Sequence, residues 1–121
     1  MSANLKTLTS VTAGSLLSQQ LGTSEVAVYT CAAATSVKVA QASLCNITAS
    51  AVTVYLSIVK AGGVIGDGTH RVINGATIQV NDTLPLKDYI SGHMLGPGDI
   101  IAGYSGLGTS IDLVISGTVL S

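Results

Sequence analysis

The 121-residue chain contains few charged side chains. Lys, Arg, Asp and Glu make up 9% of the residues, where about a quarter is usual for a globular domain. The five Lys and Arg are scattered singly and the formal net charge is −1, so there is no basic stripe to bind the phosphates of a nucleic acid. A surface built from Ser, Thr, Gly, Asn and Gln is typical of a subunit covered by neighbours in an assembly. The alternative is a Ser/Thr-rich all-β monomer.

Long apolar runs are also missing. None reaches the roughly 18 residues that a membrane-spanning helix needs, and the N-terminus lacks the charged and apolar regions of a signal peptide. We therefore expect a protein made in the cytoplasm and unprocessed, with no membrane partner. The length predicts a single domain with a core of its own.

Cysteine and histidine are too few to form a framework or a metal site. Cys31 and Cys45 are the only cysteines. A simple hairpin between them would hold them too far apart for a disulfide, whereas two segments in different sheets could meet; free buried thiols are favoured. His70 and His93 have no Cys or second His three or four residues away, so no metal site is predicted.

The patterns of catalytic chemistry are absent as well. The glycine-rich stretch 62–68 is followed by Thr69, His70 and Arg71, whereas a phosphate-binding loop needs a Lys and a Ser or Thr that open a helix. No Gly-x-Ser-x-Gly pattern occurs, and Glu25 is the only Glu, with the Asp residues mostly in turns. We therefore expect no enzyme activity and no cofactor.

The clearest positive signal is the stretch Ala51–Val59. Val52, Val54, Leu56 and Ile58 alternate with polar residues, which predicts a central β-strand with one apolar face. Seven or eight such strands at short intervals predict an all-β fold over residues 23–121, an antiparallel two-sheet sandwich of jelly-roll or immunoglobulin-like type.

Further strands and turns follow from local patterns. We expect an outer strand over 25–31, a β-bulge near Val39 to Gln41 where the parity of the apolar residues changes, and a type II turn at 96–99. Two short strands are predicted over 70–74 and 76–80, an edge strand over 83–87, and a last strand over 111–116 with Ile111, Leu113 and Ile115 inward.

Residues 1–22 form a polar segment with isolated apolar residues. The spacing of Leu5, Leu8, Leu16 and Leu17 fits a helix or a strand poorly, so we predict an N-terminal arm long enough to lie across a neighbouring subunit. The alternative is a first strand that closes the edge of the sandwich, preceded by a frayed tail.

The order of several short motifs carries a family resemblance. The motifs are Val28-Tyr29-Thr30, Leu44-Cys45-Asn46, Val52 to Leu56, Gly96 to Ile101 and Ile115-Ser116-Gly117. Over residues 25–117 the chain resembles the small β-sandwich virion proteins of tailed bacteriophages. The resemblance implies a non-enzymatic structural component of the virion, such as a capsid decoration or cement protein bridging shell subunits. Its partners would be the major capsid protein or other virion proteins, and a symmetric homo-oligomer, a trimer in the first place, is favoured.

Partner contacts are expected on the arm, on the glycine-rich loop and at two tyrosines. The residues are Leu5, Leu8, Leu16, Leu17, Tyr55, Gly63, Val64, Ile65 and Tyr89. A receptor- or glycan-binding module of a tail or fibre, using Tyr55, Tyr89 and the loop, is the main alternative, because exposed aromatic rings bind sugar faces. A β-sandwich module unrelated to virions is a third possibility.

Overall fold

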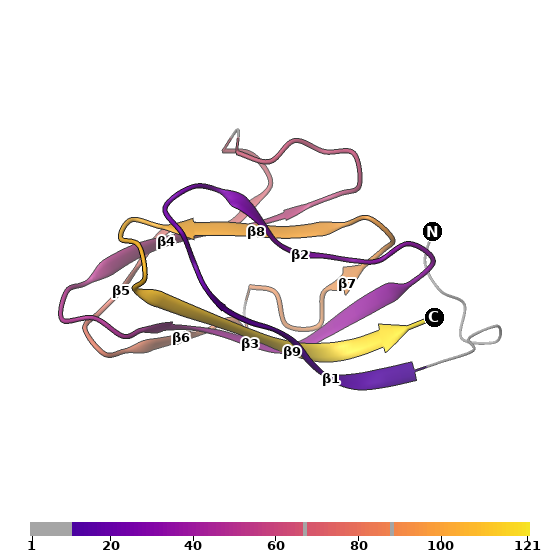
Figure 1. Ribbon diagram of the computed structural model, residues 1–121, viewed down its shortest axis with the longest axis horizontal. Helices are drawn as coiled ribbons and strands as arrows, with labels where there is room; N and C mark the ends of the chain where they lie inside the picture. Colours follow the sequence, from indigo (N-terminus) through magenta and orange to yellow (C-terminus); the bar gives the residue numbers. More distant parts are fainter. Residues whose placement is uncertain (1–10, 67, 88) are drawn as a thin grey trace.

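Two antiparallel sheets pack face to face in a computed structural model that describes residues 11–66, 68–87 and 89–121 (Figure 1). The first sheet contains β1 (Val11–Gln20), β9 (Ile111–Leu120), β3 (Ser36–Asn46) and β6 (Thr83–Pro85) in that order, and the short β7 (Met94–Leu95) also pairs with β3. The second sheet contains β2 (Val26–Thr30), β8 (Ile100–Ser105), β4 (Val52–Val59) and β5 (Arg71–Ile78). No helix occurs in these ranges. The predicted β-sandwich is confirmed.

The strand order is that of a jelly roll. The chain passes from one sheet to the other at most of its connections, the hairpin from β4 to β5 and the short step from β6 to β7 excepted. When the short β7 is left out, the first sheet has the order β1-β9-β3-β6 and the second sheet the order β2-β8-β4-β5. An immunoglobulin-like sandwich would keep more sequential strands together in one sheet.

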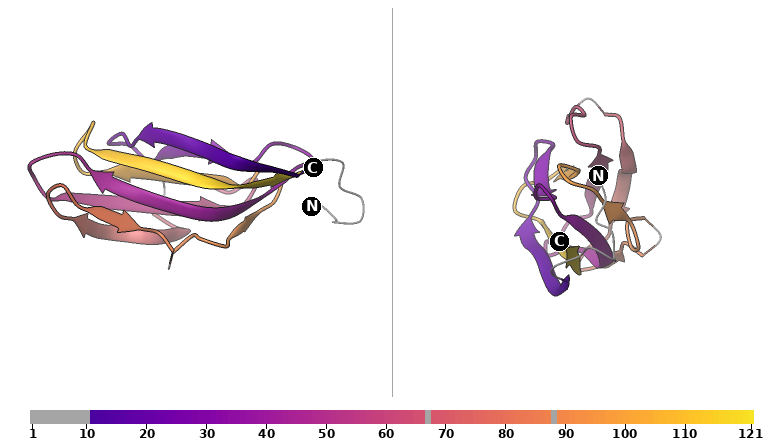
Figure 2. Two further views of the ribbon diagram at one scale, coloured as in Figure 1. Left: turned by 90° about the horizontal axis from the view of Figure 1, so that it is seen from below. Right: turned by 90° about the vertical axis from the view of Figure 1, so that its right-hand side faces the viewer.

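The core is built from the inward rows of the two sheets, which lie one above the other in Figure 1; the left view of Figure 2 shows the first sheet face-on. Ile111, Leu113 and Ile115 of β9 are fully buried, as predicted. Strand β4 lies between β8 and β5, so the prediction of a central strand is also confirmed. Its inward row continues to the end of the strand, since the half-buried Ile58 lies opposite the buried Ile101 and packs against the core. Val59 is buried as well, beside Gly63 of the following loop.

Two local predictions in the loops and bulges are confirmed. The register of β3 against β9 shifts between Val39 and Gln41, where the parity change predicted a bulge. In the turn before β8, Gly98 has a φ of 80° and the Asp99 amide donates to the Gly96 carbonyl over 3.0 Å, as a type II turn requires.

Three expectations need correction or completion. The two short strands expected over 70–74 and 76–80 are one strand, β5, which bends at Gly75 with a φ of 89°. Residues 11–20, expected to belong to an arm, form strand β1 paired with β9. The alternative of an edge strand therefore describes this part, and residues 1–10 lie outside the described ranges.

Both cysteines are free thiols, Cys31 buried and Cys45 half-buried.

β9 is flanked so closely by its neighbours that one position admits only glycine. Gly117 of β9 lies opposite Gly14 of β1 on one side and Val39 of β3 on the other. A Cβ atom at Gly117 would collide with the backbone carbonyl of Lys38 and approach Leu16 Cδ1 to 3.1 Å, whereas a Cβ at Gly14 would meet nothing within 4 Å. The missing side chain at Gly117 therefore lets three strands approach at the β3 bulge.

We predict opposite effects for alanine at the two glycines. Gly117→Ala must push the backbone of β3 away, and overpacking of this kind costs about 1–3 kcal/mol of unfolding free energy. Gly14→Ala meets no obstacle and should be neutral, or stabilise by at most about 1 kcal/mol through the unfolded state. Urea unfolding of both variants measures the difference, and equal effects would contradict the close approach.

Candidate partner-contact surfaces

The predicted contact residues fall on separate parts of the molecule. Tyr55 of β4 lies on the outer face of the second sheet, and Gly63, Val64 and Ile65 lie in the loop between β4 and β5. Leu16 and Leu17 are half-buried in β1 at the edge of the first sheet and pack against the core. Leu5 and Leu8 lie outside the described residues.

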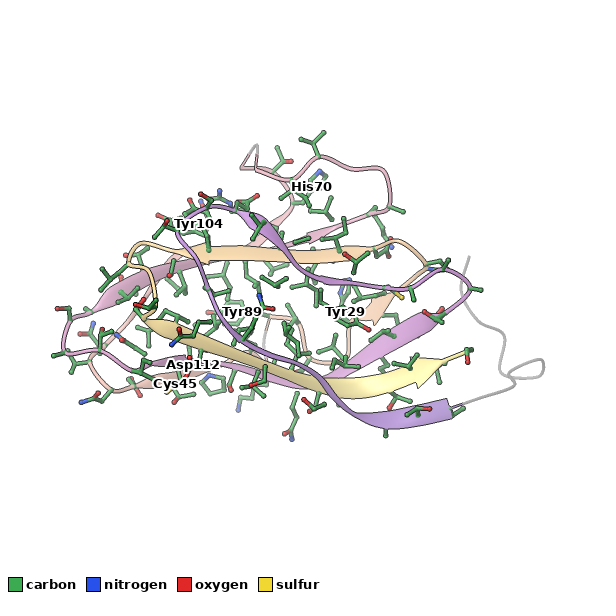
Figure 3. The ribbon with its side chains drawn as sticks, viewed as in Figure 1. Tyr29, Cys45, His70, Tyr89, Tyr104 and Asp112 are labelled. Atoms are coloured by element: carbon green, nitrogen blue, oxygen red, sulfur yellow. The ribbon has the colours of Figure 1, made fainter. Side chains whose placement is uncertain are left out.

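Tyr89 is not brought together with Tyr55. It is 42% exposed and belongs to the segment after β6, which hydrogen-bonds along β3 in the first sheet through the Leu86 and Gly92 amides (Figure 3). A single binding site made of both tyrosines and the glycine-rich loop is therefore not formed.

A row of side chains crosses β5, β4 and β8 of the second sheet and ends at the residue before β2. Tyr104 of β8 and Tyr55 of β4 are direct cross-strand neighbours, and their rings stack with centroids 4.4 Å apart and planes 7° from parallel. The guanidinium of Arg71, from β5, lies 4.8 Å from the Tyr55 centroid and 5.4 Å from that of Tyr104, within cation–π range. Arg71 then reaches Glu25, which precedes β2, over 2.8 Å.

This row ties the glycine-rich loop to the sheet. The second carboxylate oxygen of Glu25 accepts a hydrogen bond from the Gly66 amide over 2.7 Å. The Glu25 and Arg71 side chains are only 6% and 16% exposed. Burial would lower the pKa of Arg71, but the hydrogen bond to Glu25 raises it, so the guanidinium keeps its charge in spite of being largely buried. We define Glu25, Tyr55, Arg71 and Tyr104 as the aromatic strap.

Asp99 anchors the start of the same loop. Its carboxylate accepts hydrogen bonds from the amides of Ala61 over 3.0 Å and Gly96 over 2.9 Å, and from the Lys60 ammonium over 3.2 Å. Burial alone would raise the pKa of Asp99, but these two amides and Lys60 lower it below its ordinary value. Because Lys60 is 78% exposed, the amides contribute more than the ion pair.

The loop between β4 and β5 is therefore fixed at its start, at Ala61, and near its middle, at Gly66. It projects from the sandwich (Figures 1 and 2), and Val64 near its middle is 60% exposed. A fixed loop with an exposed apolar residue suits a contact with another protein, because little conformational entropy is lost when it binds.

A second apolar feature lies at the end of the sandwich far from Val11 and the C-terminus (Figure 1). Ile47, Val80 and Leu107, in the loops β3–β4, β5–β6 and β8–β9, are 45–50% exposed. We call these three residues the apolar tip. None of them is flanked by a charged residue in the sequence.

Buried polar groups hold the three loops of the apolar tip in place. Asn46, which is fully buried, donates to the carbonyls of Ser50, Ile78 and Gln79. The Ile47 amide donates to the Ser110 carbonyl over 3.0 Å, and the Ser110 hydroxyl donates to the Leu107 carbonyl. The tip is therefore a preformed surface.

A shallow groove of about 390 Å³ lies on the outer face of the first sheet. Gln41, Ser43 and Ser116 supply polar groups, Val114 supplies apolar surface, and Lys87 is its one charged lining residue. This face also carries Cys45 and Asp112, which are cross-strand neighbours (Figure 3). The groove has little chemistry beyond hydrogen bonding.

The titratable groups do not assemble into a site. In the three described ranges, no group of three or more His, Cys, Asp or Glu side chains could hold a metal ion. Burial, and then the nearby Cys31, raise the pKa of Tyr29. The same ranges contain no helix long and apolar enough to span a membrane.

Sequence reasoning missed the roles of Glu25, Arg71 and Tyr104, and it missed the apolar tip. The alternation of residues in β4 predicted that Tyr55 points outward. Its stacking on Tyr104 depends on the pairing of β4 with β8, two strands far apart in the chain. The strap and the tip both depend on long-range pairing, which no local pattern carries.

Comparisons with known proteins add no relative. No family model, no curated protein and no solved structure matches the chain.

We predict that the strap, more than Lys60, fixes the loop. Arg71→Leu keeps an aliphatic side chain but leaves Glu25 buried without its cation, so the Gly66 amide should exchange its hydrogen at least about tenfold faster, as expected for local opening. Lys60→Met is the control, since an exposed ion pair contributes little. Amide exchange followed by NMR compares the two, and equal protection of Gly66 in Arg71→Leu and the native chain would contradict the anchoring role.

Asp99 should make stability depend on pH. Its pKa is lowered from the ordinary 3.8 by folding, so its contribution is complete above about pH 4 and is lost as the pH falls through the lower folded value. Asp99→Asn should cost about 1–3 kcal/mol at pH 7, and the difference from the native chain should shrink below pH 4. Urea unfolding between pH 2 and 7 measures this, with Asp112→Asn on the outer face of β9 as control. A gap that stays constant with pH would contradict the assignment.

Proposed function

We propose that the chain is a non-enzymatic structural protein of a virion, which decorates or cements a capsid shell. The observation that carries the proposal is the apolar tip. Ile47, Val80 and Leu107 are held in preformed loops at one end of the sandwich, as expected of a surface that docks on another protein.

Composition and fold support the same function. The charged fraction of 9% is low for a freely soluble monomer, and jelly rolls are common among viral capsid domains. The fold is shared with lectins and other proteins, so it agrees with the proposal without carrying it. Many modest contacts repeated by the symmetry of a shell would then hold each copy.

Receptor or glycan binding is the second candidate, and the aromatic strap counts against it. A sugar stacks on a free ring face, whereas Tyr55 and Tyr104 stack on each other and contact Arg71. Tyr89 alone remains exposed at 42%. The geometry therefore favours the shell component.

The test is the copy number of the chain in purified particles of the virus that encodes it, measured by quantitative mass spectrometry against the major capsid protein. A ratio of the same order as the shell subunit supports decoration. Absence from the particles would overturn the virion proposal, and a few copies per particle would move the protein to the neck, tail or fibre.

The role of the apolar tip is tested by two substitutions in one loop. Leu107→Asp puts a charge on the tip and should lower the copy number on particles at least about tenfold, because an unpaired charge in an apolar interface is costly. Thr109→Asp adds the same charge two residues away, where the φ of 54° suits Asp, and should bind like the native chain. Equal occupancy of both variants would exclude the tip as the contact.

A further inference from the structure

The four edges of the two sheets are protected to different degrees. β6 is three residues long and ends in Pro85, and β2 has five residues and a register shift. β5 carries Arg71, bends at Gly75 and shifts register twice. Short length, proline, charge and bulges are the devices that keep edge strands from pairing with other chains.

β1 uses only one of these devices. It is ten residues long, and its sequence, VTAGSLLSQQ, contains no charged residue and no proline. It has one bulge, between Ser15 and Leu17. β1 is thus the edge best suited to accept another strand.

The bulge fixes which residues share a face. Ala13, Ser15, Ser18 and Gln20 pair with Thr118, Ser116, Val114 and Asp112 on the outer face of β9. Gly14, Leu17 and Gln19 pair with the buried Gly117, Ile115 and Leu113, and Leu16 points the same way, towards Gly117. The outward residues are therefore odd-numbered before Leu16 and even-numbered after it.

The backbone amides and carbonyls of β1 also alternate between β9 and the free edge of the sheet. Leu21, just after β1, donates its amide to the Ile111 carbonyl over 2.9 Å. Because antiparallel bonding alternates, Gln19 and Leu17 also bond towards β9, and Ser18 and Gln20 direct their amides and carbonyls away from it. On the other side of the bulge, the extra residue shifts the alternation by one position. The amides and carbonyls of Ala13 and Ser15 therefore also point away from β9.

From this we infer that β1 pairs antiparallel with β1 of a second copy, about a two-fold axis near Leu16, with Ser15 opposite Ser18 of the partner subunit. Cross-strand neighbours must lie on the same face. When the two residue numbers of a pair sum to 33, the matched pairs are 13 with 20, 14 with 19, 15 with 18 and 16 with 17. Each pair then joins like faces, whereas neighbouring registers set an outward residue against an inward one.

The second copy is the occupant that the strand itself specifies. At the axis, the half-buried Leu16 of one copy meets Leu17 of the other on the inward side, which extends the core across the interface. An uncharged strand sets no like charges opposite each other, and the other edges of the molecule are protected. Two-fold pairing closes on itself and yields a dimer, in place of the trimer favoured by the resemblance. This inference does not depend on the proposed function.

The test uses charges at Ser15 and Ser18 in the full chain. The double variant Ser15→Lys with Ser18→Lys sets Lys opposite Lys twice and should be at least about tenfold weaker as a dimer. The matched variant Ser15→Lys with Ser18→Glu changes the same exposed positions but sets Lys opposite Glu, and should remain dimeric. Mixing the double-Lys variant with the corresponding double-Glu variant should restore a heterodimer.

Sedimentation equilibrium gives the masses, and circular dichroism checks the fold. A native chain that is monomeric at high micromolar concentration would overturn the inference, and this is also the result expected if another segment of the chain covered β1. A dimer unaffected by the double-Lys change, or the absence of a heterodimer on mixing, would overturn it equally. Occupancy on particles is a separate measurement, so the proposed function can fail while the dimer holds.

Discussion

The packing of two apolar rows against each other is the constraint on which the rest of the structure depends. β9 and β4 lie inside their sheets and present alternating Ile, Leu and Val to one common core. Since charged residues are scarce, this alternation decides which way every strand faces. A bulge therefore has consequences well beyond its own position, as at Leu16 of β1, where one extra residue changes which later residues of the strand point outward.

What could be read from the sequence was local. The alternation of Ala51–Val59, the parity change near Val39 and the turn at Gly98 each depend on a few adjacent residues, and the structure has them all. The pairing of β1 with β9 and the 46-residue separation of Glu25 and Arg71 depend on long-range register, which alternation does not encode. The contact residues named from the sequence accordingly include the loop and Tyr55 and stay a prediction, while the strap that holds the loop and the apolar tip could be recognised only from the structure.

Four of the few charged residues serve to order one loop. Two of the ion pairs, Glu25 with Arg71 and Asp99 with Lys60, both hold the loop between β4 and β5. Three of these four side chains are 16% exposed or less. Loop order thus comes from groups that would elsewhere give solubility, and the surface that remains is hydroxyl-rich and weakly repulsive towards other copies or partners.

The two ends of the sandwich differ, and the difference has a practical consequence. Val11 and Leu120 are neighbours at one end, and the loops of Ile47, Val80 and Leu107 lie at the other (Figures 1 and 2). A second polypeptide joined after Ser121 would emerge on the side away from those loops. The molecule could therefore serve as an adaptor that presents a fused cargo to solvent while its opposite end is occupied.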